Sequence, residues 1–123
     1  MKNNKLVIVG TMAFDKIITP TAESGKILGG AATYIGLAAA FADADIAAVS
    51  VVGEDFTDEH LNLLSDRGIN ISGVERVSGG KSFYWKGKYH DNMNKRDTLD
   101  TQLNVLADFK PVVPEAYRDA SIV

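Results

Sequence analysis

The stretch Gly29–Gly53, GGAATYIGLAAAFADADIAAVSVVG, contains a predicted helix followed by a predicted strand. Two glycines open the alanine-rich segment Ala31–Ala42, and four of its residues recur at the i, i+3, i+4 and i+7 positions of a helix. These residues are Tyr34, Leu37, Ala38 and Phe41. The spacing predicts an amphipathic helix with these side chains as its apolar stripe, lying close to a sheet. The apolar run Ile46–Val52 then predicts a strand that ends at Gly53.

Further predicted strands indicate a parallel sheet. Upstream, Leu6–Val9 is a short apolar run that stops at Gly10, which predicts a buried strand with a functional loop at its C-terminal end. A strand–helix–strand order implies parallel pairing. A second helix is expected at Thr57–Arg67 and a further strand at Val74–Val77. The predicted class is therefore α/β, a parallel sheet flanked by helices.

Other segments predict strands that lie outside this sheet. Ile17–Pro20 and Lys26–Leu28 flank a turn-prone stretch and favour a hairpin. In Lys81–Tyr89 apolar and polar side chains alternate, which is typical of a half-exposed strand. Its apolar face carries Phe83, Trp85 and Tyr89, and its polar face carries Ser82, Tyr84, Lys86 and Lys88. We expect His90–Gln102 to form a turn and a returning strand.

The C-terminal residues predict a short helix at Glu115–Asp119, after two prolines, and then an apolar segment, Ser121–Val123. The latter resembles the first residues of a buried strand, whose backbone groups need partners. Two interpretations stay open: the strand continues in a longer protein, or it is a terminal edge strand.

Composition excludes several classes of function. The 123 residues suit one compact domain, and 46% are hydrophobic, which is too many for a disordered chain. A net charge of -3 without a basic run argues against binding to nucleic acid or to an anionic membrane. The absence of cysteine excludes disulfides and thiolate metal sites. Since the run Leu6–Val9 is too short for a signal peptide or a membrane span, we expect a cytoplasmic protein.

Three motifs in order carry a resemblance to a known family. They are Val7–Asp15 (VIVGTMAFD), Gly29–Tyr34 (GGAATY) and Val49–Phe56 (VSVVGEDF). Together with their spacing they resemble the N-terminal part of the ribokinase-like (PfkB) carbohydrate and nucleoside kinases. The resemblance covers residues 1–123 and implies a small β-sheet lid built from about 14–28 and 81–107. In this family the lid covers the substrate, and it often pairs with a second subunit, so a homodimer is expected.

The resemblance also implies a set of substrate-binding residues: Asp15, Gly29, Gly30, Tyr34, Phe83 and Trp85. A carboxylate at Asp15 is acceptor-only and can hold two vicinal hydroxyls. Gly29 and Gly30 let the backbone approach a ligand, and free N–H groups are expected at the helix start. The alternatives are a solvated loop for Asp15 and a simple turn for the glycines.

Two positions depart from the family pattern. Ala13 and Tyr34 stand where members often carry asparagines that contact sugar hydroxyls. The ring of Tyr34 could stack on a nucleobase or a sugar face, or it could belong to the buried stripe of the helix. Phe83 and Trp85 could meet the ligand or the lid of a second subunit, or they could belong to an ordinary edge hairpin. The departures leave room for a nucleoside or another furanose in place of ribose.

The residues for phosphoryl transfer are not expected in this chain. In the resembled family a later Gly-Ala-Gly-Asp segment supplies the base and the anion hole, and that segment does not occur here. The resemblance thus implies a parent kinase that uses ATP and Mg²⁺ on a hydroxymethyl group. No catalytic, cofactor-binding or metal-binding residue is assigned, and the chain alone is expected to be inert and to bind neither cofactor.

Specific residues bear on other classes of function. A non-catalytic ligand-binding or dimerisation module of the same fold remains the alternative. No Gly-x-Gly-x-x-Gly follows Gly10 and no P-loop occurs, so an oxidoreductase or P-loop enzyme is not indicated. His60 is expected on a helix surface and His90 in a loop, without metal-ligand spacing. The acidic residues between 54 and 59 are interpreted as a solvated helix start.

Overall fold

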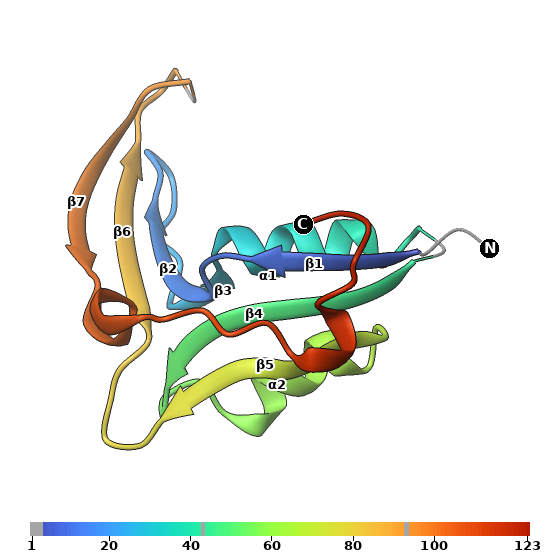
Figure 1. Cartoon of the computed structure of the whole chain (residues 1–123). Coiled ribbons are helices and arrows are strands. Elements are labelled where there is room, and N and C mark those ends of the chain that lie inside the picture. Colours follow the sequence, from blue (N-terminus) through green and yellow to red (C-terminus); the bar gives the residue numbers. More distant parts are fainter. Residues whose placement is uncertain (1–3, 43, 93) are drawn as a thin grey trace.

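The computed structural model describes residues 4–42, 44–92 and 94–123. In chain order the elements are β1 (Lys5–Val9), β2 (Ala13–Ile18), β3 (Ile27–Gly29), α1 (Ala31–Ala39), β4 (Asp45–Gly53), α2 (Asp58–Ser65), β5 (Ile69–Val77), β6 (Phe83–Tyr89), β7 (Arg96–Gln102) and the 3₁₀ helices η1 (Asn104–Asp108) and η2 (Glu115–Tyr117). They form two sheets, which Figure 1 shows standing at an angle to one another. Among the described helices, none has the length and apolarity that crossing a bilayer requires.

Sheet A is the three-stranded parallel sheet that the apolar runs predict, in the order β1-β4-β5. Alternate side chains of a strand point to opposite faces. On one face, Ile8 and Ala48 share a core cluster with Ala32 of α1 and Leu64 of α2. On the other face, residues of β1 and β4 pack against Tyr117 of the C-terminal segment. Both faces of sheet A are therefore covered by the chain itself, as continuous apolar strands require.

The buried face of α1 differs from the predicted stripe. Its buried residues are Ala32, Thr33 and Gly36, whereas Tyr34 is 55% exposed and Phe41, beyond the end of the helix, is 91% exposed. The reason is close packing: a Cβ at Gly36 would lie 3.2 Å from the side chain of Ile69. Small residues therefore occupy the closest part of the helix–sheet contact. Leu37 of the predicted stripe still packs against the core cluster, whereas Tyr34 and Phe41 point outward.

Sheet B has the order β3-β2-β6-β7 and contains every segment predicted to lie outside the parallel sheet. β2 and β3 form the expected hairpin, with Ala13 opposite Gly29, and β6 and β7 are antiparallel. β2 and β6 pair in parallel, which joins the two hairpins into one sheet. β2 begins at Ala13, so Asp15 lies within a strand and not in the functional loop that was predicted to follow Leu6–Val9.

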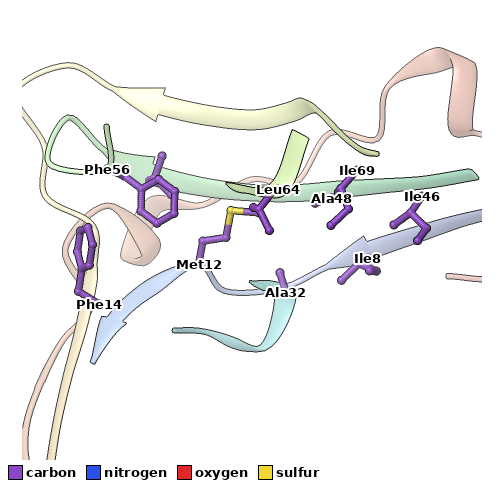
Figure 2. Close-up of a cluster of buried hydrophobic side chains, with 10 residues drawn as sticks. Ile8, Met12, Phe14, Ala32, Ile46, Ala48, Phe56, Leu64 and Ile69 are labelled. Carbon is purple, nitrogen blue, oxygen red and sulfur yellow. The ribbon is translucent and has the colours of Figure 1, made fainter. Parts of the chain in front are cut away.

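The two faces of β6 are not simply ligand-facing and solvent-facing. Ser82, just before the strand, is only 1% exposed, and Tyr84 packs against the main core cluster. The base of the predicted polar face therefore lies on the α/β body. The core continues into sheet B because the ring of Phe14 in β2 lies 5.5 Å from the ring of Phe56. Figure 2 shows this cluster running from Ile8 to Phe14 and Phe56.

The C-terminal segment returns from sheet B across the open face of sheet A. The predicted helix there is a single 3₁₀ turn, Glu115–Tyr117. Ile122 then pairs with Leu6 in a parallel bridge, and the amide of Val7 donates to the carbonyl of Ile122 at 2.9 Å. The strand predicted at Ser121–Val123 is thus present as one bridge on the edge of β1.

Candidate functional site

A pocket of about 490 Å³ lies between sheet B and the first turns of α1. Its lining residues are Asp15, Ile17, Gly30, Ala31, Tyr34, Phe83, Trp85, Tyr89 and Arg96. Five of the six residues predicted to bind substrate line it. The sixth, Gly29, lies directly beneath the carboxylate of Asp15. The structure therefore brings together side chains from β2, β6, β7 and α1 that are up to 81 residues apart in the sequence.

A second hollow, of about 510 Å³, lies beneath the C-terminal segment. Its lining is mostly apolar, and it contains none of the residues predicted to bind substrate. Ser50 reaches it with a buried hydroxyl that has no hydrogen-bond partner among the described residues. The pocket at Asp15 is the better candidate because it combines a carboxylate, a guanidinium and aromatic rings.

Asp15 is the acceptor in the pocket. In β2 it is opposite Ile27 of β3 on one side and Trp85 of β6 on the other. Its carboxylate lies across Gly29, where any Cβ would collide with it. Within the described part of the chain nothing donates a hydrogen bond to this carboxylate. Partial burial raises the pKa of Asp15 above its usual value. A half-buried carboxylate with free lone pairs is suited to accept hydrogen bonds from hydroxyl groups.

The start of α1 differs from the expectation of free N–H groups. The amide of Ala31 donates to Oγ1 of Thr11 at 2.9 Å, and the amide of Ala32 donates to the Thr11 carbonyl at 2.9 Å. Gly30 precedes them with φ +95°, and a Cβ there would lie 2.5 Å from the same carbonyl. The double glycine thus permits a tight contact with Thr11, and two amides of the helix start are already used.

Tyr34 stands at the rim of the pocket. Its hydroxyl donates a long hydrogen bond, 3.4 Å, to the carbonyl of Leu28. Since more than half of the side chain is exposed, its ring is available on the pocket side and is not part of a buried stripe. Ala13, the other departure from the family pattern, is fully buried between Gly29 and Phe83, and offers no polar group.

An aromatic wall forms the side of the pocket opposite α1. Phe83, Trp85 and Tyr89 line it from alternate positions of β6, as the sequence predicts. The indole ring of Trp85 lies over Gly87, where a Cβ would collide with it. Its Nε1 donates to Oγ1 of Thr98 in β7 at 3.2 Å. The ring is therefore fixed before any ligand arrives.

Arg96 is a pocket residue that the sequence analysis missed. Its guanidinium carbon lies 5.5 Å from the centroid of the Trp85 ring, within the range of a cation–π contact. It reaches the pocket because it pairs with Tyr89 across β6 and β7. The signal that could have found it is the predicted return strand, but the sequence gives no bounds for the turn within residues 90–102, so the residue opposite Tyr89 could not be identified.

Both histidines contact other residues of the protein. Nδ1 of His60 accepts from the amide of Thr57 at 3.1 Å, and its ring lies 5.1 Å from that of Phe14, so it is partly buried and not a plain surface residue. His90 contacts Asp97 at 2.8 Å near the β6–β7 turn. Over the described ranges, no group of three His, Cys, Asp or Glu side chains is arranged to hold a metal ion.

Comparisons with known proteins agree with this architecture. A curated cytidine kinase from Thermococcus kodakarensis is 31% identical over 117 residues, which cover 95% of this chain and 41% of that kinase. The chain resembles the ribokinase-like kinases in sequence and in fold. No protein-family profile matches it. The chain spans about two-fifths of the relatives that it matches.

Solved structures support the ribokinase-like fold. The nucleoside kinase of Methanocaldococcus jannaschii has a TM-score of 0.72 at 21% identity, over 91% of this chain and 42% of that one. The Burkholderia thailandensis nucleoside kinase in complex with inosine has a TM-score of 0.71 at 17% identity, over 84% and 37%. A Cryptococcus neoformans ribokinase in complex with ADP scores 0.69 at 13% identity, over 98% and 40%. The α/β class with a ribokinase-like arrangement is therefore confirmed.

Proposed function

We propose that this chain forms the substrate-binding part of an ATP-dependent kinase that phosphorylates a hydroxymethyl group of a nucleoside or sugar. One observation carries the proposal: the unpartnered carboxylate of Asp15 lies in one pocket with the aromatic wall of β6 and the rim of α1. The likeness in sequence to a cytidine kinase supports the same reaction class. A carboxylate that accepts two hydroxyls would orient a furanose ring toward the incoming phosphate.

The lining of the pocket favours a nucleoside over a free sugar. Tyr34, Phe83, Trp85 and Tyr89 give it four aromatic rings, which is more apolar surface than a sugar alone can cover. A planar base can stack on such rings. Arg96, at the end of the pocket formed by β7, offers N–H donors to the carbonyl and ring-nitrogen acceptors of a base. Asp15 would then hold the ribose hydroxyls.

ATP, Mg²⁺ and the catalytic base are not assigned to residues of this chain. Phosphoryl transfer needs a positioned base and stabilisation of the transferring phosphate. The resemblance implies that a Gly-Ala-Gly-Asp segment supplies both, and these 123 residues do not contain it. ATP and Mg²⁺ thus belong to the proposed parent enzyme, where the substrate pocket described here would present the acceptor hydroxyl.

We also propose that sheet B pairs with a second copy of the protein, and that the protein acts in the cytoplasm. β7 is an edge strand of sheet B, and its backbone edge is available for contacts. The cysteine-free composition fits a reducing cytoplasm, and the proposed use of ATP supports the same compartment. A non-catalytic module that only binds ligand or dimerises is the competing function.

A phosphorylation assay separates these functions. The full natural protein, incubated with ATP and Mg²⁺, should phosphorylate cytidine or inosine faster than D-ribose. Asp15→Asn should lower kcat/KM by about 10-fold or more, because a charged hydrogen bond contributes about 1.5–3 kcal/mol. Asp66→Asn, at the exposed C-terminal end of α2, is the matched control and should retain activity. Saturable nucleoside binding without phosphoryl transfer would support the binding module instead.

A further inference from the structure

Sheet B is joined to the body of the protein at two separate places. Near α1, the chain passes through Thr11 into β2 and returns through Gly29 and Gly30. At the far side, the segment Gly79–Ser82 leads into β6, and residues 103–105 lead out of β7 (Figure 1). Because the pocket is walled by sheet B and by α1, its width depends on both junctions.

The far junction is built on the turn that ends β4, Gly53–Asp55. Oδ1 of Asp55 accepts two hydrogen bonds from Ser82, from its amide at 2.9 Å and from its hydroxyl at 2.7 Å. The same hydroxyl accepts from the amide of Gly53 at 2.9 Å. Ser82 is 1% exposed, so these bonds are partly shielded from water. One carboxylate oxygen thereby holds the residue that precedes Phe83 of the pocket wall.

Further bonds tie the incoming segment to the same turn. Oε2 of Glu54 accepts from the amide of Gly79 at 3.0 Å, and the amide of Glu54 donates to the carbonyl of Gly80 at 3.1 Å. The two backbones touch: a Cβ at Gly53 would lie 2.5 Å from that carbonyl oxygen. The acidic residues of this turn are therefore bonded to the base of sheet B and are not merely a solvated helix start.

The outgoing segment is fastened to the incoming one. Nδ2 of Asn104 donates to the carbonyl of Ser82 at 2.9 Å, and the amide of Val105 donates to the carbonyl of Lys81 at 3.1 Å. Asn104 has φ +51°, a conformation that asparagine tolerates better than most residues. Both ends of the β6–β7 hairpin thus converge on Ser82, which Asp55 holds.

We infer that Asp55 is a positioning residue that sets where the β6 wall of the pocket stands relative to Tyr34 and α1. It contacts no pocket residue directly and acts through Ser82. This inference rests on the proposed function, because it assigns a role in substrate binding at the same pocket. A carboxylate is suited to the task because a charged acceptor holds two donors more firmly than a neutral one.

The test compares variants of the full natural protein by cytidine affinity, with inosine and D-ribose as further probes. Asp55→Ala should raise the Kd and KM about 10-fold, because a displaced β6 wall stacks less well on the bound base, while kcat at saturating cytidine changes by less than about 3-fold. Asp55→Asn retains an acceptor oxygen and should recover most of the affinity. Asp58→Asn is the matched control, because this neighbouring acid pairs with Arg76 and not with sheet B.

A second readout does not depend on ligand. Trp85 is the only tryptophan of the chain, so acrylamide quenching of its fluorescence reports the β6 wall. Asp55→Ala should increase quenching, and Asp55→Asn should not. If Asp55→Ala does not fold, Ser82→Ala replaces it, since this change removes the shared hydroxyl. Unchanged quenching and affinity in a folded variant would overturn the inference. The proposed function fails if cytidine, inosine and ribose do not bind, or if they bind Asp15→Asn as well as they bind the wild type. In that case the quenching of Trp85 alone tests whether Asp55 positions the β6 wall.

Discussion

Sheet A and sheet B differ in what covers their faces. Sheet A lies between two helices and the C-terminal segment, so both faces are buried by apolar contacts. Sheet B is covered at its base only, and the inner face of β2 and β6 opens to the pocket. Its position depends on glycines that permit backbone contact and on a few hydrogen bonds to acidic side chains. Stability should therefore depend mainly on the first region, and ligand binding on the second.

The largest expected effect is on the core that joins the sheets. Phe56 is fully buried and packs against Phe14 of sheet B. Phe56→Ala should reduce the free energy of unfolding by about 3–5 kcal/mol, because it removes a large side chain and leaves a cavity. Urea denaturation of the two proteins measures this. A loss below about 1 kcal/mol would mean that the two sheets do not share this core.

A smaller loss of stability is expected at the near junction of sheet B. Gly30 has φ +95° and touches the Thr11 carbonyl, so Gly30→Ala introduces both strain and a steric collision. The expected cost is about 1–3 kcal/mol in thermal or urea unfolding, together with weaker nucleoside binding. Gly25→Ala is the matched control, because the space around Gly25 is open and its φ is ordinary. Equal stability of the two variants would contradict the tight junction.

The aromatic wall should affect binding more than folding. Trp85→Ala removes a ring that is fixed over Gly87 and faces the pocket. If a base stacks there, the Kd for a nucleoside should rise about 10-fold or more, because stacking on an aromatic side chain contributes about 1–3 kcal/mol. D-Ribose, which has no base, should be affected much less. An equal loss for both ligands would indicate a general collapse of the wall.

The smallest effect is a gain in stability at the binding carboxylate. Burial raises the pKa of Asp15, so the folded state disfavours its charged form. The contribution of Asp15 to the free energy of unfolding is fully present below the pKa of this residue in the unfolded chain. It is lost as the pH rises through the raised pKa of the folded state. Asp15→Asn should therefore melt about 1–2 °C higher than wild type at pH 7, and the difference should vanish near pH 3.5. A constant difference across this range would show that ionisation is not the cause.

The periodicity of apolar residues was sufficient to predict the strands whose burial follows from that pattern. The apolar runs of β1 and β4 and the alternation in β6 predicted strands that the structure contains. The stripe of α1 was predicted correctly at Leu37, which packs against the core, but not at Tyr34, because close packing at Gly36 selects small residues and Tyr34 points outward. Apolar spacing alone cannot distinguish a close helix–sheet contact from an ordinary one.

The candidate site was predictable where a local motif marks it. Asp15 and the double glycine follow from the resemblance, and the structure places the carboxylate of Asp15 across Gly29 and in one pocket with Gly30. Arg96 was missed because its place opposite Tyr89 depends on where the turn between β6 and β7 ends, which the sequence does not determine. The role inferred for Asp55 was missed because its partner, Ser82, is 27 residues away and directly precedes a strand of sheet B. Long-range pairing of this kind is set by topology and not by spacing.

The most direct test of the account is a fluorescence titration of Trp85 with cytidine, in the full natural protein and in Asp15→Asn. A saturable change in emission is expected for the wild type, and at least about a 10-fold weaker response is expected for the variant, because the rings and the carboxylate hold one ligand. Saturable cytidine binding that leaves Trp85 unaffected, or that is the same in Asp15→Asn, would contradict the account.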